Sequence, residues 1–139
     1  ASLGAATLYV AAAVRDNGGG VVIGAGQAPW HAAAARRQLE AAGLADVVEI
    51  RAGDARETLH DAGGDVDLVR LDASIGAAPR LALAVMKRLA PQLQGGAIAL
   101  NARAEPDYLA WVRDPAHGFR STALPLGCGA GTELSVKAA

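Results

Sequence analysis

Residues 20–59, GVVIGAGQAPWHAAAARRQLEAAGLADVVEIRAGDARETL, contain one complete strand–helix–strand pattern. The β-branched run at 21–23 predicts a strand buried on both faces of a parallel sheet, closed by the glycines that follow it. Pro29 fits a first helical turn, and the good helix formers after it predict a helix over 31–42. Apolar residues at 47–50 predict the second strand. Because parallel strands need a crossover, this stretch is predicted to be a βαβ unit.

The same alternation continues on both sides of this unit. Apolar periodicity, glycine pairs and prolines predict the following elements: a first helix including residues 7–14, a helix over 55–62, a strand over 66–71, a helix over 79–93, a strand over 97–100, a helix over 105–116, and strands over 119–126 and 132–136. The last two strands flank a glycine-rich loop and predict an antiparallel hairpin. The predicted fold class is α/β, a doubly wound, mostly parallel Rossmann-like sheet in a single domain over 1–139.

Composition restricts the partners. The chain has 139 residues, is 52% hydrophobic and carries a net charge of −1, from 13 basic and 14 acidic residues, so it can bury a core in one domain. This balance gives no electrostatic reason to expect nucleic acid or an anionic membrane. Cys128 is the single cysteine, which excludes an internal disulfide, and neither a membrane span nor a signal peptide is visible. We expect a cytoplasmic protein.

Ligands of open parallel sheets bind beyond the carboxyl ends of the strands. The turns to examine are therefore those that follow each predicted parallel strand: 24–27, 53–56, 72–75 and 101–103. Each of them contains glycine or a short polar side chain.

Three stretches carry a family resemblance. They are SLGAATLYVAAAV at 2–14, AAGLADVVEIRAGDARETL at 41–59 followed by DLVRLDAS, and DYLAWVRDPAHGFRSTALPL at 107–126 with ELSVKAA. The chain resembles class I S-adenosylmethionine-dependent O-methyltransferases of the catechol and caffeoyl-CoA type. The resemblance implies a seven-stranded sheet, of which this chain supplies six strands. The absent strand would be the first, just before the turn at 2–5.

The resemblance implies S-adenosylmethionine as the cofactor and places Gly4, Gly26, Asp54, Ala55 and Asp72 around it. Gly4 allows close backbone approach to the methionine moiety. Asp54 would lie near the adenine amino group, although Asp54 as a helix cap is an equal alternative. In the family, an acid at the end of the second strand binds the ribose hydroxyls. This chain has Gly-Ala-Gly there, without a carboxylate.

The resemblance also implies a divalent ion, usually magnesium, held by hard oxygen donors. Asp72 and Asn101 match two of the family's ligands, whereas Leu100 stands where a second Asp is expected and Ile75 where a Lys often follows. One carboxylate and one amide leave magnesium with mostly water ligands, so we predict no tight metal site. Asp72 as a plain turn residue is the alternative.

Three functions remain open from the sequence. The first is methyl transfer to an oxygen of a small hydroxylated acceptor, with no catalytic residue assigned. The second is a non-catalytic binding or assembly module, because charge is missing where the chemistry needs it. The third is a dinucleotide (NADP/FAD)-binding domain, since VVIGAGQAP resembles a degenerate glycine fingerprint and Arg51 would then face a 2′-phosphate.

The absence of the first strand leads us to predict that the chain associates with other polypeptide. In the family it lies between the strands that begin here near Val21 and Asp67, so its absence leaves buried backbone groups unpaired, at about 1 to 3 kcal/mol each. The strand can come from other polypeptide, a neighbouring chain can supply pairing, or the flanking strands can close on each other. We predict a homodimer.

Overall fold

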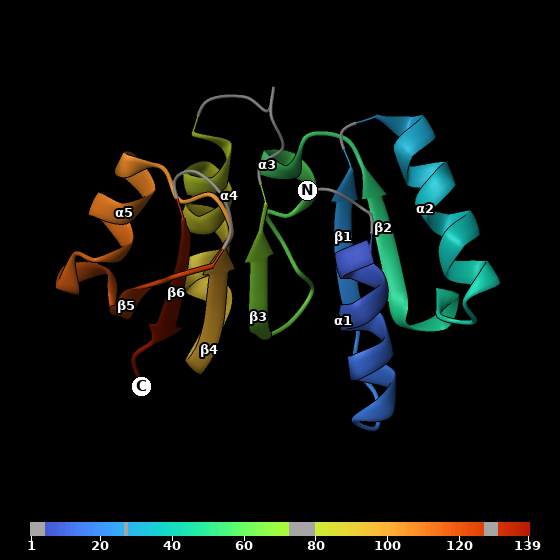
Figure 1. Ribbon diagram of the computed structural model, residues 1–139, viewed down its shortest axis with the longest axis horizontal. Coiled ribbons are helices and arrows are strands. Elements are labelled where there is room, and N and C mark those ends of the chain that lie inside the picture. The colour runs from blue at the N-terminus through green and yellow to red at the C-terminus, as the bar shows by residue number, and fades with distance from the viewer. Residues whose placement is uncertain (1–4, 27, 73–79, 127–130) are drawn as a thin grey trace. The chain divides into compact units, whose positions relative to one another are not determined.

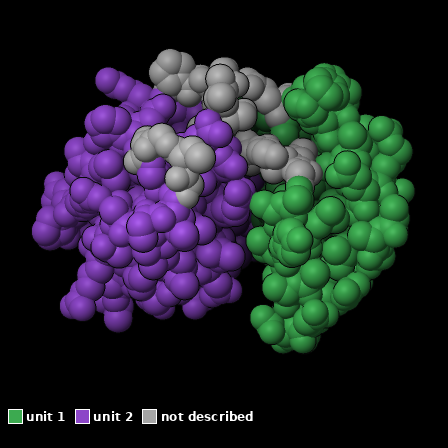
Figure 2. Space-filling model, viewed as in Figure 1, with its two compact units in different colours: residues 1–58 green, residues 59–139 purple. Residues whose placement is uncertain are grey.

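The computed structural model (Figure 1) describes residues 5–26, 28–72, 80–126 and 131–139. The chain divides into two compact units, Ala1–Thr58 and Leu59–Ala139 (Figure 2). Among the described residues, no helix is both long and apolar enough to cross a membrane.

Unit 1 contains the predicted βαβ pattern. Its elements are α1 (Ala5–Asp16), β1 (Val22–Gly26), α2 (Pro29–Ala41), the short 3-10 helix η1 (Ala45–Val47), β2 (Val48–Ala52) and α3 (Ala55–Thr58). β1 pairs in parallel with β2, with Val22 opposite Val48 and Gly26 opposite Ala52. The βαβ prediction is therefore confirmed.

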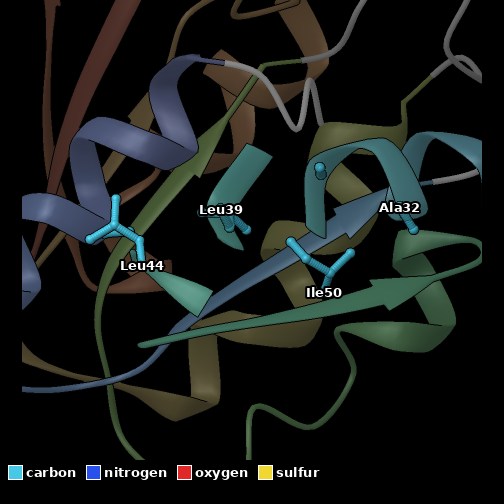
Figure 3. Packing of buried hydrophobic residues seen from close by; sticks show 6 residues of the cluster. Ala32, Leu39, Leu44 and Ile50 are labelled. Carbon is cyan, nitrogen blue, oxygen red and sulfur yellow. The ribbon is translucent and has the colours of Figure 1, made fainter. Parts of the chain in front are cut away.

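The core of unit 1 is made mostly from small side chains. Ala32, Ala35 and Leu39 share one face of α2 and are at most 3% exposed. They belong to a buried cluster with Ala11 of α1 and Ile50 of β2 (Figure 3). Alanine at these positions lets helix and sheet backbones approach closely, which explains why an alanine-rich segment forms a core helix here.

Unit 2 contains the remaining elements. They are β3 (Val66–Leu71), α4 (Leu81–Leu89), η2 (Ala90–Gln92), β4 (Leu93–Asn101), α5 (Pro106–Val112), η3 (Pro115–His117), β5 (Phe119–Leu124) and β6 (Thr132–Lys137). The strand order is β3-β4-β6-β5; β3 and β4 are parallel, whereas β6 is antiparallel to both β4 and β5. The α/β class and the antiparallel C-terminal hairpin are confirmed.

The glycines of unit 1 correct one predicted boundary. Gly24 and Gly26 were expected to end the strand, but they lie inside β1, opposite Ile50 and Ala52. Strand pairing uses backbone groups alone, so a glycine can continue a ladder wherever its neighbours hold it extended.

The observed start of β4 also differs from the predicted start of that strand, again because of glycines. Gly95 and Gly96 were expected to precede a strand beginning at residue 97, yet β4 begins at Leu93 and runs through them. The pairing with β3 is irregular at this point, and Gly96 has a φ of 87°. A Cβ on Gly95 would lie 2.9 Å from the Cα of Ala139. These glycines therefore mark a bulge inside a strand.

Three of the predicted helices are shorter than expected. The helix over 55–62 ends at Thr58, where the Arg51 guanidinium donates a 2.7 Å hydrogen bond to the Thr58 carbonyl. The segments predicted as helices over 79–93 and 105–116 each include a separate 3-10 turn near their end, η2 and η3. A proline lies in the first two residues of each turn, Pro91 in η2 and Pro115 in η3. Proline lacks the N–H that would continue an α-helix.

The described strands form two ladders, one in each unit, rather than one six-stranded ladder. Among the described residues, β1 pairs only with β2, and β3 pairs only with β4. The first strand of each unit thus has one edge without a partner strand in its own ladder.

Candidate functional site

The carboxyl ends of β1 and β2 meet in unit 1. The Gly53 N–H donates a 2.9 Å hydrogen bond to the Gly26 carbonyl, which ties the end of β1 to the turn after β2. Gly53 has a φ of 127°, and a Cβ there would lie 3.2 Å from the Thr58 Cγ2, so this turn favours glycine. Three predicted cofactor residues, Gly26, Asp54 and Ala55, therefore share one edge of the ladder.

Asp54 caps the short helix α3. Its Oδ1 accepts a 2.9 Å hydrogen bond from the Arg56 backbone N–H, and the Arg56 Nε lies 3.0 Å from both carboxylate oxygens. Hydrogen bonding to Asp54 raises the pKa of the Arg56 guanidinium above its ordinary value. The capping role considered for Asp54 is thus confirmed. The same contacts hold its carboxylate in one orientation at the strand end.

The end of β1 offers no acid for ribose hydroxyls. Residues 24–26 are Gly-Ala-Gly, and Ala25 is 3% exposed. Arg51, which the dinucleotide hypothesis assigned to a 2′-phosphate, donates 2.8 Å and 2.7 Å hydrogen bonds to Glu49 and to the Thr58 carbonyl. Arg51 therefore supports the β2–α3 connection.

The carboxyl ends of β3 and β4 meet in unit 2. Leu71 lies opposite Asn101, and the Ala102 N–H donates a 2.9 Å hydrogen bond to the Leu71 carbonyl. Asn101 is fully buried, and its Oδ1 accepts a 3.1 Å hydrogen bond from the Arg103 N–H. Its Nδ2 has no hydrogen-bond partner among the described residues. The side chain thus fixes the turn that carries Arg103.

Asp72 lies between two arginines that the sequence interpretation did not assign to a site. The Arg70 Nη2 is 3.3 Å from one carboxylate oxygen of Asp72, and the Arg103 Nε is 3.8 Å from the other. Arg70 stands two residues before Asp72, a spacing that puts both on one face of the strand, and this was the available signal. The contribution of Arg103 depends on the β3–β4 register, which the sequence does not display.

The residues at this edge do not fit a divalent cation. Asp72 already faces two guanidinium groups, and the Asn101 Oδ1 is used by a backbone N–H. No group of three or more His, Cys, Asp or Glu side chains with metal-binding geometry occurs among the described residues. Magnesium prefers carboxylate and phosphate oxygens in near-octahedral geometry, and binding here would displace both ion pairs.

We therefore expect millimolar magnesium to leave the thermal unfolding midpoint unchanged. Sodium chloride at the same ionic strength serves as the control for general salt effects. An upward shift of several degrees with magnesium, absent in an Asp72→Asn variant, would contradict this prediction.

A buried polar network supports the strand end in unit 2. Glu133 of β6 lies opposite Asn101, and its side chain is 2% exposed. The Arg113 Nε and Nη2 each donate a 2.8 Å hydrogen bond to it, and the Ser121 hydroxyl donates a 2.7 Å one. The bond from Arg113 lowers the pKa of Glu133 despite its burial. The Ser121 and Ser135 hydroxyls are 2.8 Å apart.

Tyr108 of α5 lies close to Ser135 and Glu133 of this network. It is 1% exposed, and burial raises its pKa to about 12, although nearby Ser135 opposes that shift. Its hydroxyl forms no hydrogen bond of normal geometry among the described residues. Trp111 stacks on His117 with ring centroids 4.4 Å apart. Tyr108 is therefore a core residue, and Trp111 packs against its neighbours on η3.

The structure thus groups five of the predicted site residues by unit. Gly26, Asp54 and Ala55 lie together in unit 1, and Asp72 and Asn101 lie together in unit 2. Gly4, together with Ile75 and Cys128, lies outside the described residues.

Comparisons with known proteins agree with this geometry. The protein family described as a methyltransferase domain matches residues 1–101. No curated protein matches at the significance threshold.

Solved structures similar to the chain include three that are longer than it. Cofactor-bound Rv0187 from MTB has a TM-score of 0.78 and 28% identity, over 98% of this chain and 69% of its own. A methyltransferase from Geobacter sulfurreducens has a TM-score of 0.77 and 23% identity, over 98% and 67%. The O-methyltransferase TomG from Streptomyces achromogenes, in complex with SAM, has a TM-score of 0.74 and 18% identity, over 99% and 70%.

Proposed function

Because the chain belongs to the methyltransferase domain family, we propose that it binds S-adenosylmethionine and transfers the methyl group to an oxygen of a small hydroxylated acceptor. The observation that carries the proposal is that the end of β1 and the turn after β2 are hydrogen-bonded to each other, which we call the joined strand end of unit 1. There the Gly26–Gly53 hydrogen bond sets Asp54 and Ala55 beside the end of β1. Because Arg56 side-chain donors contact both Asp54 oxygens, we propose that the adenine amino group replaces one of these donors, while the Arg56 N–H bond that caps α3 is kept.

The proposed reaction is an in-line displacement. The acceptor oxygen attacks the methyl carbon, the carbon–sulfur bond breaks, and its electron pair stays on sulfur. The acceptor releases its hydroxyl proton to solvent water, and the products are a methyl ether and S-adenosylhomocysteine. Such a step depends mainly on holding the two reactants in line at short distance. We assign the described strand-end residues of unit 1, Gly26, Asp54 and Ala55, to holding the cofactor for that step. Gly4 and Asp72 remain the further cofactor contacts that the family resemblance implies.

A non-catalytic binding module is the second candidate, and one observation favours it. The end of β1 lacks a carboxylate, and Asp72 is already paired with Arg70 and Arg103. The dinucleotide alternative has less support, because Arg51 is engaged within unit 1 and the family match points to methyltransferases.

A methyl-transfer assay separates the two candidates. Labelled S-adenosylmethionine is incubated with a panel of small phenols and catechols, using wild type, Asp54→Asn, and Asp46→Asn as a matched exposed control in the same unit. We expect transfer that Asp54→Asn reduces and Asp46→Asn leaves intact. Cofactor binding without transfer to any acceptor would instead support the binding module.

We further propose that the two units act as one domain and that the protein is cytoplasmic with no nucleic-acid partner. The net charge of −1 and the absence of a charge run support the lack of a nucleic-acid partner. The family match over residues 1–101 includes residues of both units, which supports a single domain. The acceptor is a small molecule in this proposal.

We also propose a homodimer. Apolar side chains that remain exposed support it: Val21 beside β1 is 71% exposed, Leu68 of β3 49%, and Ile98 of β4 40%. Leu68 and Ile98 face each other across the β3–β4 pair, next to a strand edge without a partner in its ladder. Strands with apolar residues on both faces are normally covered on both.

We expect sedimentation over a tenfold dilution to show a dimer that dissociates at the low end. Leu68→Lys should shift the equilibrium toward monomer by charging the exposed apolar pair, whereas Lys87→Ala on α4 serves as a surface control. A strictly monomeric, cooperatively folded species at all concentrations would contradict the dimer.

A further inference from the structure

We propose that Arg70, Asp72 and Arg103 form an anion site that binds the carboxylate of a small molecule, at the strand end where the family resemblance implies a metal ion. The inference rests on the proposed function, since it takes the anion to be part of the acceptor. It goes further by assigning a charge to that acceptor and by naming the residues that select it.

The first step is the local charge. Two guanidinium groups face one carboxylate, at 3.3 Å and 3.8 Å, which leaves one positive charge uncompensated within the cluster. Within the described chain, neither arginine has another acidic partner in ion-pair range. A ligand carboxylate would neutralise the uncompensated positive charge, whereas a divalent cation would raise the local positive charge further.

The second step is access. The side chain of Arg103 is 50% exposed and that of Arg70 33% exposed, so a solute can reach both guanidinium groups. The distance from the Arg103 Nε to Asp72 is longer than a hydrogen bond, and the guanidinium makes no other side-chain hydrogen bond among the described residues. Its donors are therefore available to a planar oxyanion, which a guanidinium can bind in a bidentate manner.

The third step is pre-organisation. The buried Asn101 holds the Arg103 backbone through a 3.1 Å hydrogen bond, and Ala102 extends the pairing with β3. The Arg103 side chain thus begins from a fixed point at the strand end. Asp72 keeps the two arginines close together in the free protein and competes with the incoming carboxylate. Exposed ion pairs of this kind contribute little to stability, so the exchange of partners is not strongly opposed.

The test compares two probes that differ only in charge. Para-hydroxybenzoate carries a carboxylate, and para-hydroxybenzamide is its neutral counterpart of nearly the same shape. We expect calorimetry to show at least about tenfold tighter binding of the acid to the wild type, from charge-assisted hydrogen bonds to the two arginines.

Variants at the cluster should act with opposite signs. Arg103→Gln should remove most of the preference for the acid, whereas Asp72→Asn should strengthen acid binding, since it removes the internal competitor. Arg88→Gln, an exposed arginine on α4, should change neither. If Asp72 bound a metal or only stabilised the turn, Asp72→Asn would leave acid binding unchanged or weaken it.

Equal affinity for the two probes, a preference that survives in Arg103→Gln, or no measurable binding of the acid at millimolar concentration would overturn the anion site. Failure of the proposed function has a different signature. In that case S-adenosylmethionine would not bind, while the charge preference at the cluster and its loss in Arg103→Gln would persist.

Discussion

Glu133→Gln should destabilise unit 2 by about 2 to 4 kcal/mol, a large fraction of an ordinary domain's stability. The wild-type carboxylate is 2% exposed and accepts a bidentate pair of hydrogen bonds from Arg113 and a third from Ser121. The glutamine amide keeps the shape but turns an N–H₂ group toward the guanidinium, which also carries only donors. Arg113 is 47% exposed and can regain water, so we place the effect below that of a fully buried pair.

Thermal unfolding followed by circular dichroism measures this effect, and we expect the midpoint to fall by about 5 to 15 °C. Glu40→Gln, an exposed position on α2, is the matched control and should stay within about 0.5 kcal/mol of the wild type. A Glu133→Gln variant that unfolds within two or three degrees of the wild type would contradict the account of the network.

The effect should also depend on pH. Arg113 lowers the pKa of Glu133 below its ordinary value of 4.5, so the folded state favours the charged carboxylate. A group with a lowered folded-state pKa stabilises the fold above the unfolded pKa and loses that contribution as the pH falls through the folded value. The difference in unfolding free energy between wild type and Glu133→Gln should therefore be largest near neutral pH and should decrease at acidic pH.

Binding of S-adenosylmethionine should be weak, with a dissociation constant of about ten micromolar or higher. A ribose normally held by a carboxylate loses charge-assisted hydrogen bonds worth about 1.5 to 3 kcal/mol each when that group is absent. Residues 24–26 offer only backbone groups at this position, which lowers affinity by about one to several decades.

Calorimetric titration with S-adenosylmethionine, and with its demethylated product, measures this affinity. Added magnesium should not change it, because the strand-end residues do not fit the metal. A submicromolar dissociation constant would show that other groups replace the missing acid.

The sequence predicted the fold class because its apolar periodicity is strong over residues 20–100 and the tail changes to a strand pattern. It misplaced boundaries where glycine occurs inside a strand. Gly24 and Gly96 look like turn residues in one dimension, yet one continues a ladder and the other sits at a bulge. Only pairing with the neighbouring strand distinguishes these cases.

Site residues were predictable from the sequence where their position follows from the order of strands along the chain. They were less predictable where their role depends on a side chain from another strand or helix. Asp54 follows β2 after a single glycine, and its cap on α3 was an expected alternative. The arginine pair around Asp72 was missed, because the contribution of Arg103 comes from the neighbouring strand end. Glu133 was missed for a similar reason, since a buried carboxylate in a strand is recognised only through the α5 arginine that faces it.

The central claim is that the joined strand end of unit 1 receives the cofactor. Its most direct test is an amide NMR titration of the isotope-labelled chain with S-adenosylhomocysteine. We predict saturable shifts concentrated at Gly26, Gly53, Asp54 and Ala55, greatly reduced in Asp54→Asn and preserved in Asp46→Asn. Saturation that leaves these four amides unchanged, or no perturbation anywhere at millimolar ligand, would contradict the claim.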